Sequence, residues 1–232
     1  MRWVAFAWAG ASAGCGFHGH AVPGEDARLA VDAATTGCPA PGLTWFTDFA
    51  VDPTTLDANG DGLPDFHFRN GPSGTFDGTW SEAGTAARAL DTNPKQDFAT
   101  RTRTHVRMKN TQRGVGHGAV FWINSGYTAS SYAAEFLDVR LEADGQHQTL
   151  SVYWWNNLAE QQQYVLGGLT TGFVTADLDI DPVHDTLLLE CEGTTTTLPL
   201  MRAPRLGDDR WATVMALGGD AVFDEVRIES CP

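Results

Sequence analysis

The segment Arg101-Thr-Arg-Thr-His-Val-Arg-Met-Lys109 alternates between basic side chains and side chains that are apolar or carry a small hydroxyl group. Its basic residues are Arg101, Arg103, His105, Arg107 and Lys109. Successive side chains of a β-strand point to opposite faces of the sheet. The period of two therefore predicts a strand with one basic face and one face suited to burial.

The same period recurs along much of the chain. The strand-like runs are residues 100–109, 135–142, 148–154, 174–180, 186–192 and 221–228. Turn signals such as Asn70-Gly71-Pro72, Asp144-Gly145 and Gly218-Gly219-Asp220 lie between them, and no long window has a helical period. This pattern predicts an all-β protein, with residues 43–232 forming an antiparallel β-sandwich or jelly roll as a single domain.

The composition is that of an acidic folded protein. The chain has 232 residues, of which 42% are hydrophobic and 19% are charged. It carries 29 acidic and 15 basic residues, which gives a formal net charge of −14. Such a charge repels nucleic acid and anionic membranes and favours cation binding. We therefore expect no nucleic-acid partner.

Residues 1–15 have the features of a targeting segment. Met1-Arg2 supplies a positive charge, residues 3–13 are apolar or small, and small residues precede Cys15. The segment resembles the signal peptide and lipobox of bacterial lipoproteins, which implies export and lipidation at Cys15. The protein would then be an outer-membrane or cell-surface lipoprotein that touches the membrane only through its lipid. The alternatives are a plain secretory signal or a misassigned start codon.

Residues 16–42 are rich in Gly, Ala, Pro and Thr and predict a flexible tether. With Cys15 lipidated, Cys38, Cys191 and Cys231 remain. Cys38 precedes the predicted sandwich, Cys231 is the penultimate residue, and the termini of a domain often lie together. We predict a Cys38–Cys231 disulfide, with a Cys191–Cys231 pair as the alternative. Alternation places Cys191 on the apolar face of its strand, as a small buried thiol.

The stretch Asp57-Ala-Asn59-Gly-Asp61-Gly62-Leu63-Pro-Asp65 has oxygen-bearing side chains at alternate positions. Ca²⁺ takes roughly six to eight oxygen ligands from a loop that bends sharply around it. The run is not an EF-hand, because the twelfth residue from Asp57 is Phe68 rather than Glu. It resembles the calcium loops of thrombospondin type 3 repeats and dockerins, which implies a structural Ca²⁺ site; the alternative is a solvated turn. The implied ligands are the side chains of Asp57, Asn59, Asp61 and Asp65 and the carbonyl oxygen of Leu63.

Two segments carry a resemblance to a known superfamily. Residues 43–49, Leu-Thr-Trp-Phe-Thr-Asp-Phe, are similar to the first strand of laminin-G-like modules. Residues 220–228, Asp-Ala-Val-Phe-Asp-Glu-Val-Arg-Ile, are similar to their last strand. Over residues 43–232 the chain resembles the concanavalin A-like lectin/glucanase superfamily. Because that superfamily contains lectins, adhesion modules and glycosidases, the resemblance implies the fold without choosing among these functions.

The basic face of residues 101–109 has two interpretations. It is either a platform for anionic sugars or phosphates, or one side of a set of cross-strand charge pairs. The available acidic partners are Asp177, Asp179 and Asp181 in one run and Asp138 and Glu142 in another. In a chain this acidic we expect internal pairing.

Aromatic rings stack on the C–H faces of sugars and are the usual sugar-binding surface. The best candidate ligand site is the run Tyr153, Trp154, Trp155 and Asn156. Alternation sends Trp154 to the opposite face from Tyr153 and Trp155, and the amides of residues 161–163 are possible hydrogen-bond donors nearby. The alternative is that these rings fill the core, the role that we expect of Trp45, Trp122 and Trp211.

No catalytic residues are assigned. Glycosidases of the superfamily set two carboxylates on one strand face at a fixed separation. Here Glu135 and Asp138 fall on opposite faces, and residues 177–181 hold Asp without Glu. The sequence therefore predicts an exported, calcium-stabilised, non-catalytic sandwich that binds a glycan or another cell-surface polymer. The alternatives are a structural or adhesive surface lipoprotein without a small ligand, and a divergent glycoside hydrolase.

Overall fold

The computed structural model describes residues 44–69, 76–83, 89–93, 100–111, 116–124, 127–128, 131–132, 137–143, 146–156, 159–200, 211–216 and 220–231. The chain divides into two units, Met1–Gly37 and Cys38–Pro232, and every described residue belongs to the second. The predicted signal segment, the predicted tether, Cys15 and Cys38 lie outside the described residues. Within the described part, no helix is long and apolar enough to cross a membrane.

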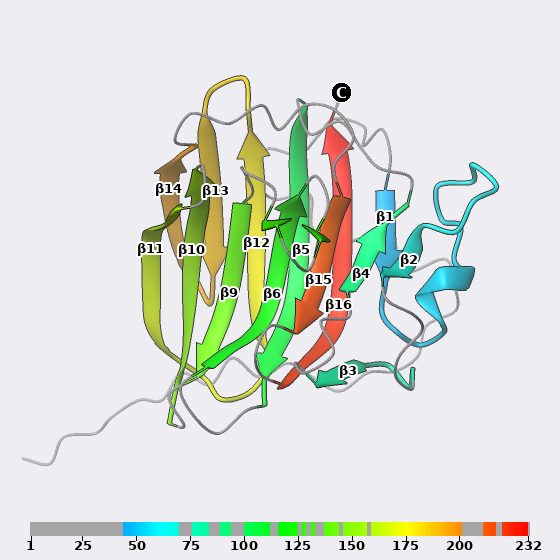
Figure 1. Ribbon diagram of the computed structural model, residues 1–232, viewed down its shortest axis with the longest axis horizontal. Helices are drawn as coiled ribbons and strands as arrows, with labels where there is room; N and C mark the ends of the chain where they lie inside the picture. The colour runs from blue at the N-terminus through cyan, green and yellow to red at the C-terminus, as the bar shows by residue number, and fades with distance from the viewer. Residues whose placement is uncertain are drawn as a thin grey trace, which may run out of the picture. The chain divides into compact units, whose positions relative to one another are not determined.

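The second unit is built from two antiparallel β-sheets packed face to face (Figure 1), which confirms the predicted all-β sandwich. The strands of sheet A are β1 (Thr44–Thr47), β3 (Trp80–Ala83), β5 (Arg101–Asn110), β12 (Val174–Asp181), β13 (Thr186–Cys191), β14 (Thr194–Pro199) and β16 (Asp220–Cys231). Their order is β1-β16-β5-β12-β13-β14, with β3 also paired to β16. The first and last of these strands along the chain are therefore neighbours.

Sheet B lies in front of sheet A in Figure 1. Its strands are β2 (Phe66–Arg69), β4 (Ala89–Thr92), β6 (Gly116–Asn124), β9 (Leu137–Ala143), β10 (Gln148–Asn156), β11 (Ala159–Leu169) and β15 (Trp211–Ala216). Their order is β11-β10-β9-β6-β15-β4-β2. The short strands β7 (Tyr127–Thr128) and β8 (Ser131–Tyr132) pair with each other, and η2 (Pro53–Thr55) is a single 3-10 turn.

The core lies between the sheets, where alternate residues of the strands point inward. The inward residues of β5 are all buried: Thr102, Thr104, Val106 and Met108. At one end of the core Trp80 packs between Phe49 and Phe223, with ring centroids 6.0 and 5.4 Å away. Burying a large apolar side chain contributes about 1.5–3 kcal/mol, so this alternation holds the two sheets together.

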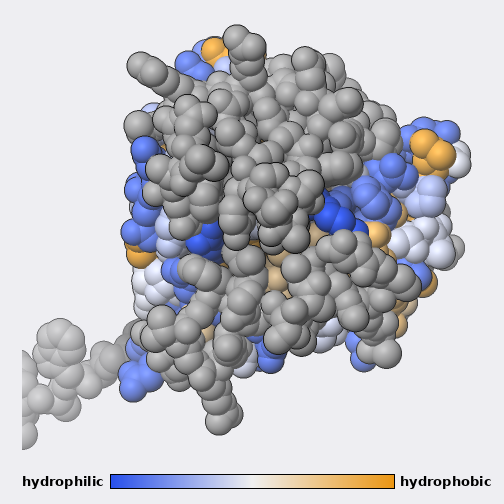
Figure 2. Space-filling model, in the orientation of Figure 1, coloured by the Kyte–Doolittle hydropathy of each residue, from blue (hydrophilic) through white to orange (hydrophobic). Residues whose placement is uncertain are grey.

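The predicted strand runs all coincide with strands, and their ends differ from the prediction by at most three residues. The basic run at 100–109 is β5, and the run at 135–142 is β9. Hydrophilic side chains predominate on the described surface that is visible in Figure 2. The large exposed apolar residues of the described part are scattered over several segments: Val51, Leu63, Val165, Val183 and Leu188.

The cysteines differ in chemical state. Cys191 is a free thiol, buried in the core on the same face as Leu187 and Leu189, as alternation predicts. Burial raises the pKa of this thiol to about 12, so it is protonated and unreactive near neutral pH. Cys231 is disulfide-bonded. Because Cys191 is free, the alternative Cys191–Cys231 pair is wrong, and the pairing of Cys231 with Cys38 stays a prediction.

Candidate functional site

The basic residues of β5 lie on the outer face of sheet A beside the acidic residues of β12. Asp179 accepts hydrogen bonds from Arg101 at 2.7 and 2.5 Å, and its Oδ2 lies 3.4 Å from Nε of Arg103. The other pairs along this ladder are His105 with Asp177 and Arg107 with Asp224. The expected internal pairing is therefore confirmed for these four basic residues of β5, with Asp224 as an acidic partner that the sequence analysis did not name. The second acidic pair, Asp138 and Glu142, lies on β9 in the other sheet.

The outer face of sheet B carries a line of side chains that crosses the whole sheet. Register pairs join them in order from β11 to β2: Gln162, Tyr153, Asp138, Trp122, Thr213, Asp91 and His67. We call this set the cross-strand row. Its middle is buried, since Trp122 is 1% exposed and Asp138 and Asp91 are 0% exposed. Toward β11 the row reaches the surface, where Tyr153 is half-buried and Gln162 is exposed.

Two arginines on this face are each paired with a carboxylate of the row. Nε and Nη2 of Arg69 donate to the two oxygens of Asp91 at 2.7 Å, and Thr213 donates to the same carboxylate at 2.5 Å. Nε and Nη2 of Arg140 lie 2.7 and 2.5 Å from Oδ2 of Asp138. Both carboxylates are fully buried. Because a buried charge without a partner is costly, the ion pairs hold the row in place.

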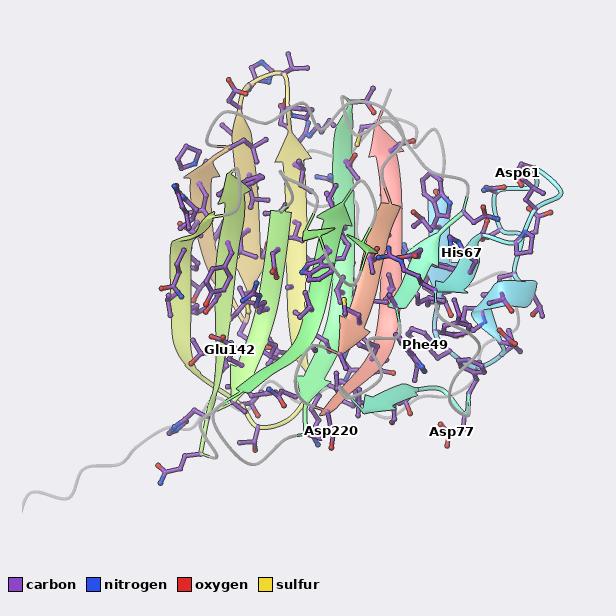
Figure 3. All side chains as sticks on the ribbon, in the orientation of Figure 1. Phe49, Asp61, His67, Asp77, Glu142 and Asp220 are labelled. Carbon is purple, nitrogen blue, oxygen red and sulfur yellow. The ribbon has the colours of Figure 1, made fainter. Side chains whose placement is uncertain are left out.

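The accessible end of the row forms a hydrogen-bonded group that we call the Tyr153 cluster: Tyr153, Gln162, Ser151, Glu142 and Arg140. Gln162 Nε2 donates to Tyr153 Oη at 3.1 Å and to Ser151 Oγ at 3.5 Å. Ser151 in turn donates to Glu142 Oε2 at 3.2 Å. The guanidinium carbon of Arg140 lies over the Tyr153 ring, 4.3 Å from its centroid. Figure 3 labels Glu142 on sheet B, where this cluster spans β9, β10 and β11.

The structure separates the four predicted ligand residues. Tyr153 is on the outer face, whereas Trp154 points inward and is a core residue that is 3% exposed. Trp154 is therefore corrected from a candidate sugar-binding ring to a core side chain, which is the alternative role considered from the sequence. Trp155 and Asn156 belong to β10, but their side chains lie outside the described part.

Two of the tryptophans expected in the core are described at side-chain level. Trp45 is fully buried in the main core between the sheets. Trp122 is also buried, but it belongs to a second, smaller apolar cluster on the outer face of sheet B, with Ala89, Val120 and Met215. The side chain of Trp211 lies outside the described part.

The predicted calcium loop runs between η2 and β2 and bends around the Asp57 carboxylate. Asp57 accepts hydrogen bonds from the backbone N–H groups of Asp61 and Gly62, at 3.1 and 3.0 Å. Asp61 accepts from Leu63 N at 2.8 Å, and Asp65 accepts from Ala58 N at 2.8 Å. Gly60 and Gly62 have φ angles of 73° and 84°, which a Cβ resists.

These loop oxygens fit a hard cation in their chemistry. Asp65 is fully buried, and its Oδ1 has no hydrogen-bond partner. Burial raises the pKa of Asp65, the backbone N–H groups of Ala58 and Asn59 lower it, and the charges of Asp57 and Asp61 raise it further. However, no three His, Cys, Asp or Glu side chains in the described part are gathered closely enough to hold a metal ion. The structure therefore provides oxygen donors and one orphaned carboxylate oxygen, without an assembled metal centre.

In the described part, the carboxylates of the outer face of sheet B are widely spaced. Asp91 and Asp138 are three strands apart in the sheet, or about 14 Å. Asp138 and Glu142 are four residues apart on β9, or about 13 Å. Glycoside hydrolysis uses carboxyl groups about 5–9.5 Å apart. Asp179, another carboxylate considered from the sequence, is held between two arginines on sheet A.

Comparisons with solved structures find domains of similar fold. The carbohydrate recognition domain of Emp47p matches with a TM-score of 0.57 and 10% identity, over 81% of this chain and 96% of that one. The exoplasmic/lumenal domain of VIP36, in its Ca²⁺/Man2-bound form, matches with a TM-score of 0.54 and 10% identity, over 80% and 89%.

The xylan β-1,4-xylosidase from Bacillus halodurans C-125 matches with a TM-score of 0.56 and 11% identity. That match covers 80% of this chain and only 39% of the xylosidase. No protein-family model and no curated protein sequence matches the chain. At these identities the comparisons show a shared β-sandwich fold and nothing about residues of the site.

Sequence reasoning found part of the Tyr153 cluster. It named Tyr153 as a ligand residue, residues 161–163 as amide donors and Glu142 as one of an acidic pair. It missed Ser151 and the stacking of Arg140 on the Tyr153 ring. The signal for both is the alternation of 138–142 and 149–153, which places these side chains on the polar face of adjacent strands.

Proposed function

We propose that the protein is a non-catalytic glycan-binding β-sandwich whose binding surface includes the Tyr153 cluster. The observation that carries this proposal is a half-buried tyrosine ring on an outer sheet face, surrounded by an amide, a hydroxyl and a carboxylate that are already hydrogen-bonded to one another. The fold neighbours described above, among them a carbohydrate recognition domain, support this assignment.

The chemistry of the cluster suits a sugar. A pyranose offers an apolar C–H face to an aromatic ring and hydroxyl groups to amides and carboxylates. Arg140 lies over Tyr153, and Asp138 holds Arg140 at 2.7 Å, so the ring has a buried ion pair beside it. A preorganised ring loses little side-chain entropy when a ligand binds, which favours affinity.

The test is a glycan screen with a matched pair of variants. Tyr153→Ala removes the proposed stacking ring, whereas Phe46→Ala removes a half-buried ring that lies 5.1 Å from Arg227 on the outer face of sheet A. We expect Tyr153→Ala to weaken glycan binding about tenfold or more, as the loss of an aromatic contact predicts. Phe46→Ala should leave the affinity unchanged. Equal affinities for the wild type and Tyr153→Ala, or no binding by the wild type, would contradict the proposal.

We further propose that the loop from Asp57 to Asp65 binds Ca²⁺ and stabilises the fold. The oxygen-only donor set and the orphaned Oδ1 of Asp65 support this proposal. In that case the Asp57, Asn59, Asp61 and Asp65 side chains and the Leu63 carbonyl hold the ion, which supplies a structural crosslink. A ligand that binds only the folded state adds about 2.7 kcal/mol at a hundredfold excess over its Kd.

Thermal unfolding tests this site. We expect EDTA to lower the Tm of the wild type and calcium to restore it. Asp61→Asn should abolish the calcium-dependent shift, whereas Asp77→Asn, an exposed carboxylate in a turn outside the loop, should retain it; both residues are labelled in Figure 3. An unchanged Tm in EDTA would show that the loop is a solvated turn.

Residues 1–15 support the remaining part of the proposal, an exported protein anchored by lipid at Cys15.

A further inference from the structure

The dipeptide Asn59-Gly60, in the loop between η2 and β2, holds the groups for a reaction of the chain with itself. The side-chain amide of an asparagine and the backbone nitrogen of the next residue can close a five-membered succinimide ring. A glycine in the second position favours this closure, because no Cβ obstructs the ring. Gly60 is exposed, has a φ of 73°, and has no atom within 4 Å of the place where a Cβ would stand.

The side chain of Asn59 is held through its oxygen and not through its nitrogen. Oδ1 accepts a hydrogen bond from the backbone N–H of Asp61 at 2.9 Å, which forms an Asx turn. This bond folds the carboxamide back over the backbone that contains the nitrogen of Gly60, and it polarises the C=O group toward attack. Nδ2 of Asn59, the atom that has to leave, is buried without a hydrogen-bond partner.

The attacking nitrogen is also without a partner. Among the described residues, three glycines follow an asparagine or an aspartate, and only the nitrogen of Gly60 donates no hydrogen bond. Gly62 N donates to Asp57 Oδ2 at 3.0 Å, and Gly78 N donates to the carbonyl oxygen of Phe49 at 2.9 Å. A bonded N–H group has to lose its partner before it attacks, whereas Gly60 does not.

We infer that Asn59 is a self-modification site, where a succinimide forms with Gly60 and is hydrolysed. In the first step the lone pair of Gly60 N forms a bond to Cγ of Asn59. The bond from Cγ to Nδ2 breaks, and the departing nitrogen takes up a proton, in place of the one that Gly60 N loses, and leaves as ammonia. In the second step water opens the ring. Attack of water on Cγ leaves an aspartyl residue at position 59, and attack on the backbone carbonyl leaves an isoaspartyl residue.

Both products change the loop. Each adds a negative charge beside Asp57, Asp61 and Asp65. The isoaspartyl product also lengthens the backbone by one methylene group at position 59. Asp57 accepts its hydrogen bonds from Asp61 N and Gly62 N, on the far side of that position, so the longer backbone disturbs these bonds. The reaction requires neither the proposed calcium site nor the proposed glycan site.

The experiment follows the modification in the folded protein. The full chain is incubated near neutral pH in isotopically labelled water with EDTA, beside a synthetic peptide of residues 57–65. Peptide mapping by mass spectrometry locates the incorporated label, and a protein-isoaspartate methyltransferase quantifies the isoaspartyl product. We expect position 59 of the folded protein to convert at least as fast as the peptide, because the turn holds the reacting groups together. Asn93 should remain unlabelled, since Pro94 has no N–H.

Two variants assign the effect to the loop. Asn59→Gln should abolish labelling at position 59, because a glutamine would have to close a larger ring. Asp77→Asn creates a second Asn-Gly step in the described part, but one whose glycine nitrogen is hydrogen-bonded to Phe49. Position 77 of this variant should therefore convert more slowly than position 59 of the same molecule. Circular dichroism melts verify that both variants are folded.

The outcomes decide between a reactive and a protected loop. If Asn59 remains intact in the folded protein while the peptide is consumed, the fold protects the residue and the inference is overturned. If position 77 of Asp77→Asn converts as fast as position 59, the hydrogen-bonding of the glycine nitrogen is not the cause. The second Asn-Gly step of the natural chain, Asn70-Gly71, lies outside the described residues, and the mapping reports it as a separate peptide.

Discussion

At the scale of single residues, His105 couples the charge ladder of sheet A to pH. Its Nδ1 lies 2.7 Å from Oδ1 of Asp177. Burial lowers the pKa of His105, but the hydrogen bond and charge of Asp177 and the charge of Glu225 outweigh burial and the repulsion of Arg227, so the pKa is raised. The protonated imidazole therefore stabilises the folded state.

The sign of the pH dependence follows from this direction. A raised pKa in the folded state gives stability that is fully present below the unfolded value, about 6.5, and is lost as the pH rises through the folded pKa. We predict that His105→Gln lowers the Tm clearly at about pH 5.5 and little at about pH 8.5. Asp177→Asn should remove the same pH-dependent contribution to the Tm. Melting curves of both variants across this range provide the measurement, and an equal loss at both pH values would contradict the prediction.

At the scale of elements, the loop between η2 and β2 depends on left-handed backbone positions. Gly62 has a φ of 84° and nothing within 4 Å of the place where a Cβ would stand. A side chain there meets no steric contact but must adopt a left-handed conformation, which costs about 1–2 kcal/mol. The cost comes from the backbone alone.

We therefore predict that Gly62→Ala lowers the Tm by about 2–8 °C, measured in EDTA so that metal binding does not contribute. Gly167→Ala is the matched control. It also leaves room for a Cβ, with Thr149 Oγ1 the nearest atom at 3.7 Å, and its φ is outside the left-handed range. This control should keep or slightly raise the Tm. Equal shifts for the two variants would show that the φ angle is not the cause.

The sequence predicted which segments form strands, but it did not predict the register in which neighbouring strands pair. Alternation predicted β5, β9, β10 and β12 because each alternates side chains suited to the core with polar side chains on its outer face. The Asp144-Gly145 signal suggests a two-residue hairpin that would pair Ala143 with Gln146. The observed pair is Ala143 with Gln148, so the connection is two residues longer.

That difference in register determines which side chains meet in the Tyr153 cluster. The observed pairing sets Ser151 opposite Arg140 and Tyr153 opposite Asp138, whereas the shorter hairpin would move each pair by two residues. A local turn signal cannot define such a register, because packing of the whole sheet selects it. β6 was not among the predicted strands for a different reason. Its residues Val120 and Trp122 are buried on the outer face, so the run does not alternate between apolar and polar side chains.

At the scale of the whole molecule, the outer faces of the two sheets differ in how their charged side chains are arranged. On sheet A four basic residues of β5, Arg101, Arg103, His105 and Arg107, are paired with acidic neighbours on β12 and β16. On sheet B two buried ion pairs support an accessible tyrosine and a third carboxylate. A ligand that needs an aromatic surface and hydrogen-bond acceptors therefore finds them on sheet B, and the sandwich core keeps the two faces separate.

The first and last strands of the domain pair with each other near Cys231. β1 pairs with β16 so that Thr44 lies opposite Glu229, two residues before the disulfide-bonded Cys231. Cys38 is six residues before Thr44 in the sequence, and six residues span at most about 20 Å, so Cys38 is within reach.

We predict that non-reducing peptide mapping of the mature protein finds Cys38 joined to Cys231, whereas Cys191 is alkylated only after unfolding, because it is a buried thiol with a pKa of about 12. Cys231→Ser should then destabilise the domain by about 2–4 kcal/mol, since the bond restricts the unfolded chain. A Cys15–Cys231 peptide, or rapid alkylation of Cys191 in the native protein, would contradict this assignment. The bond would join the segment before the first strand to the last strand, so its loss should lower the cooperativity of unfolding together with the Tm.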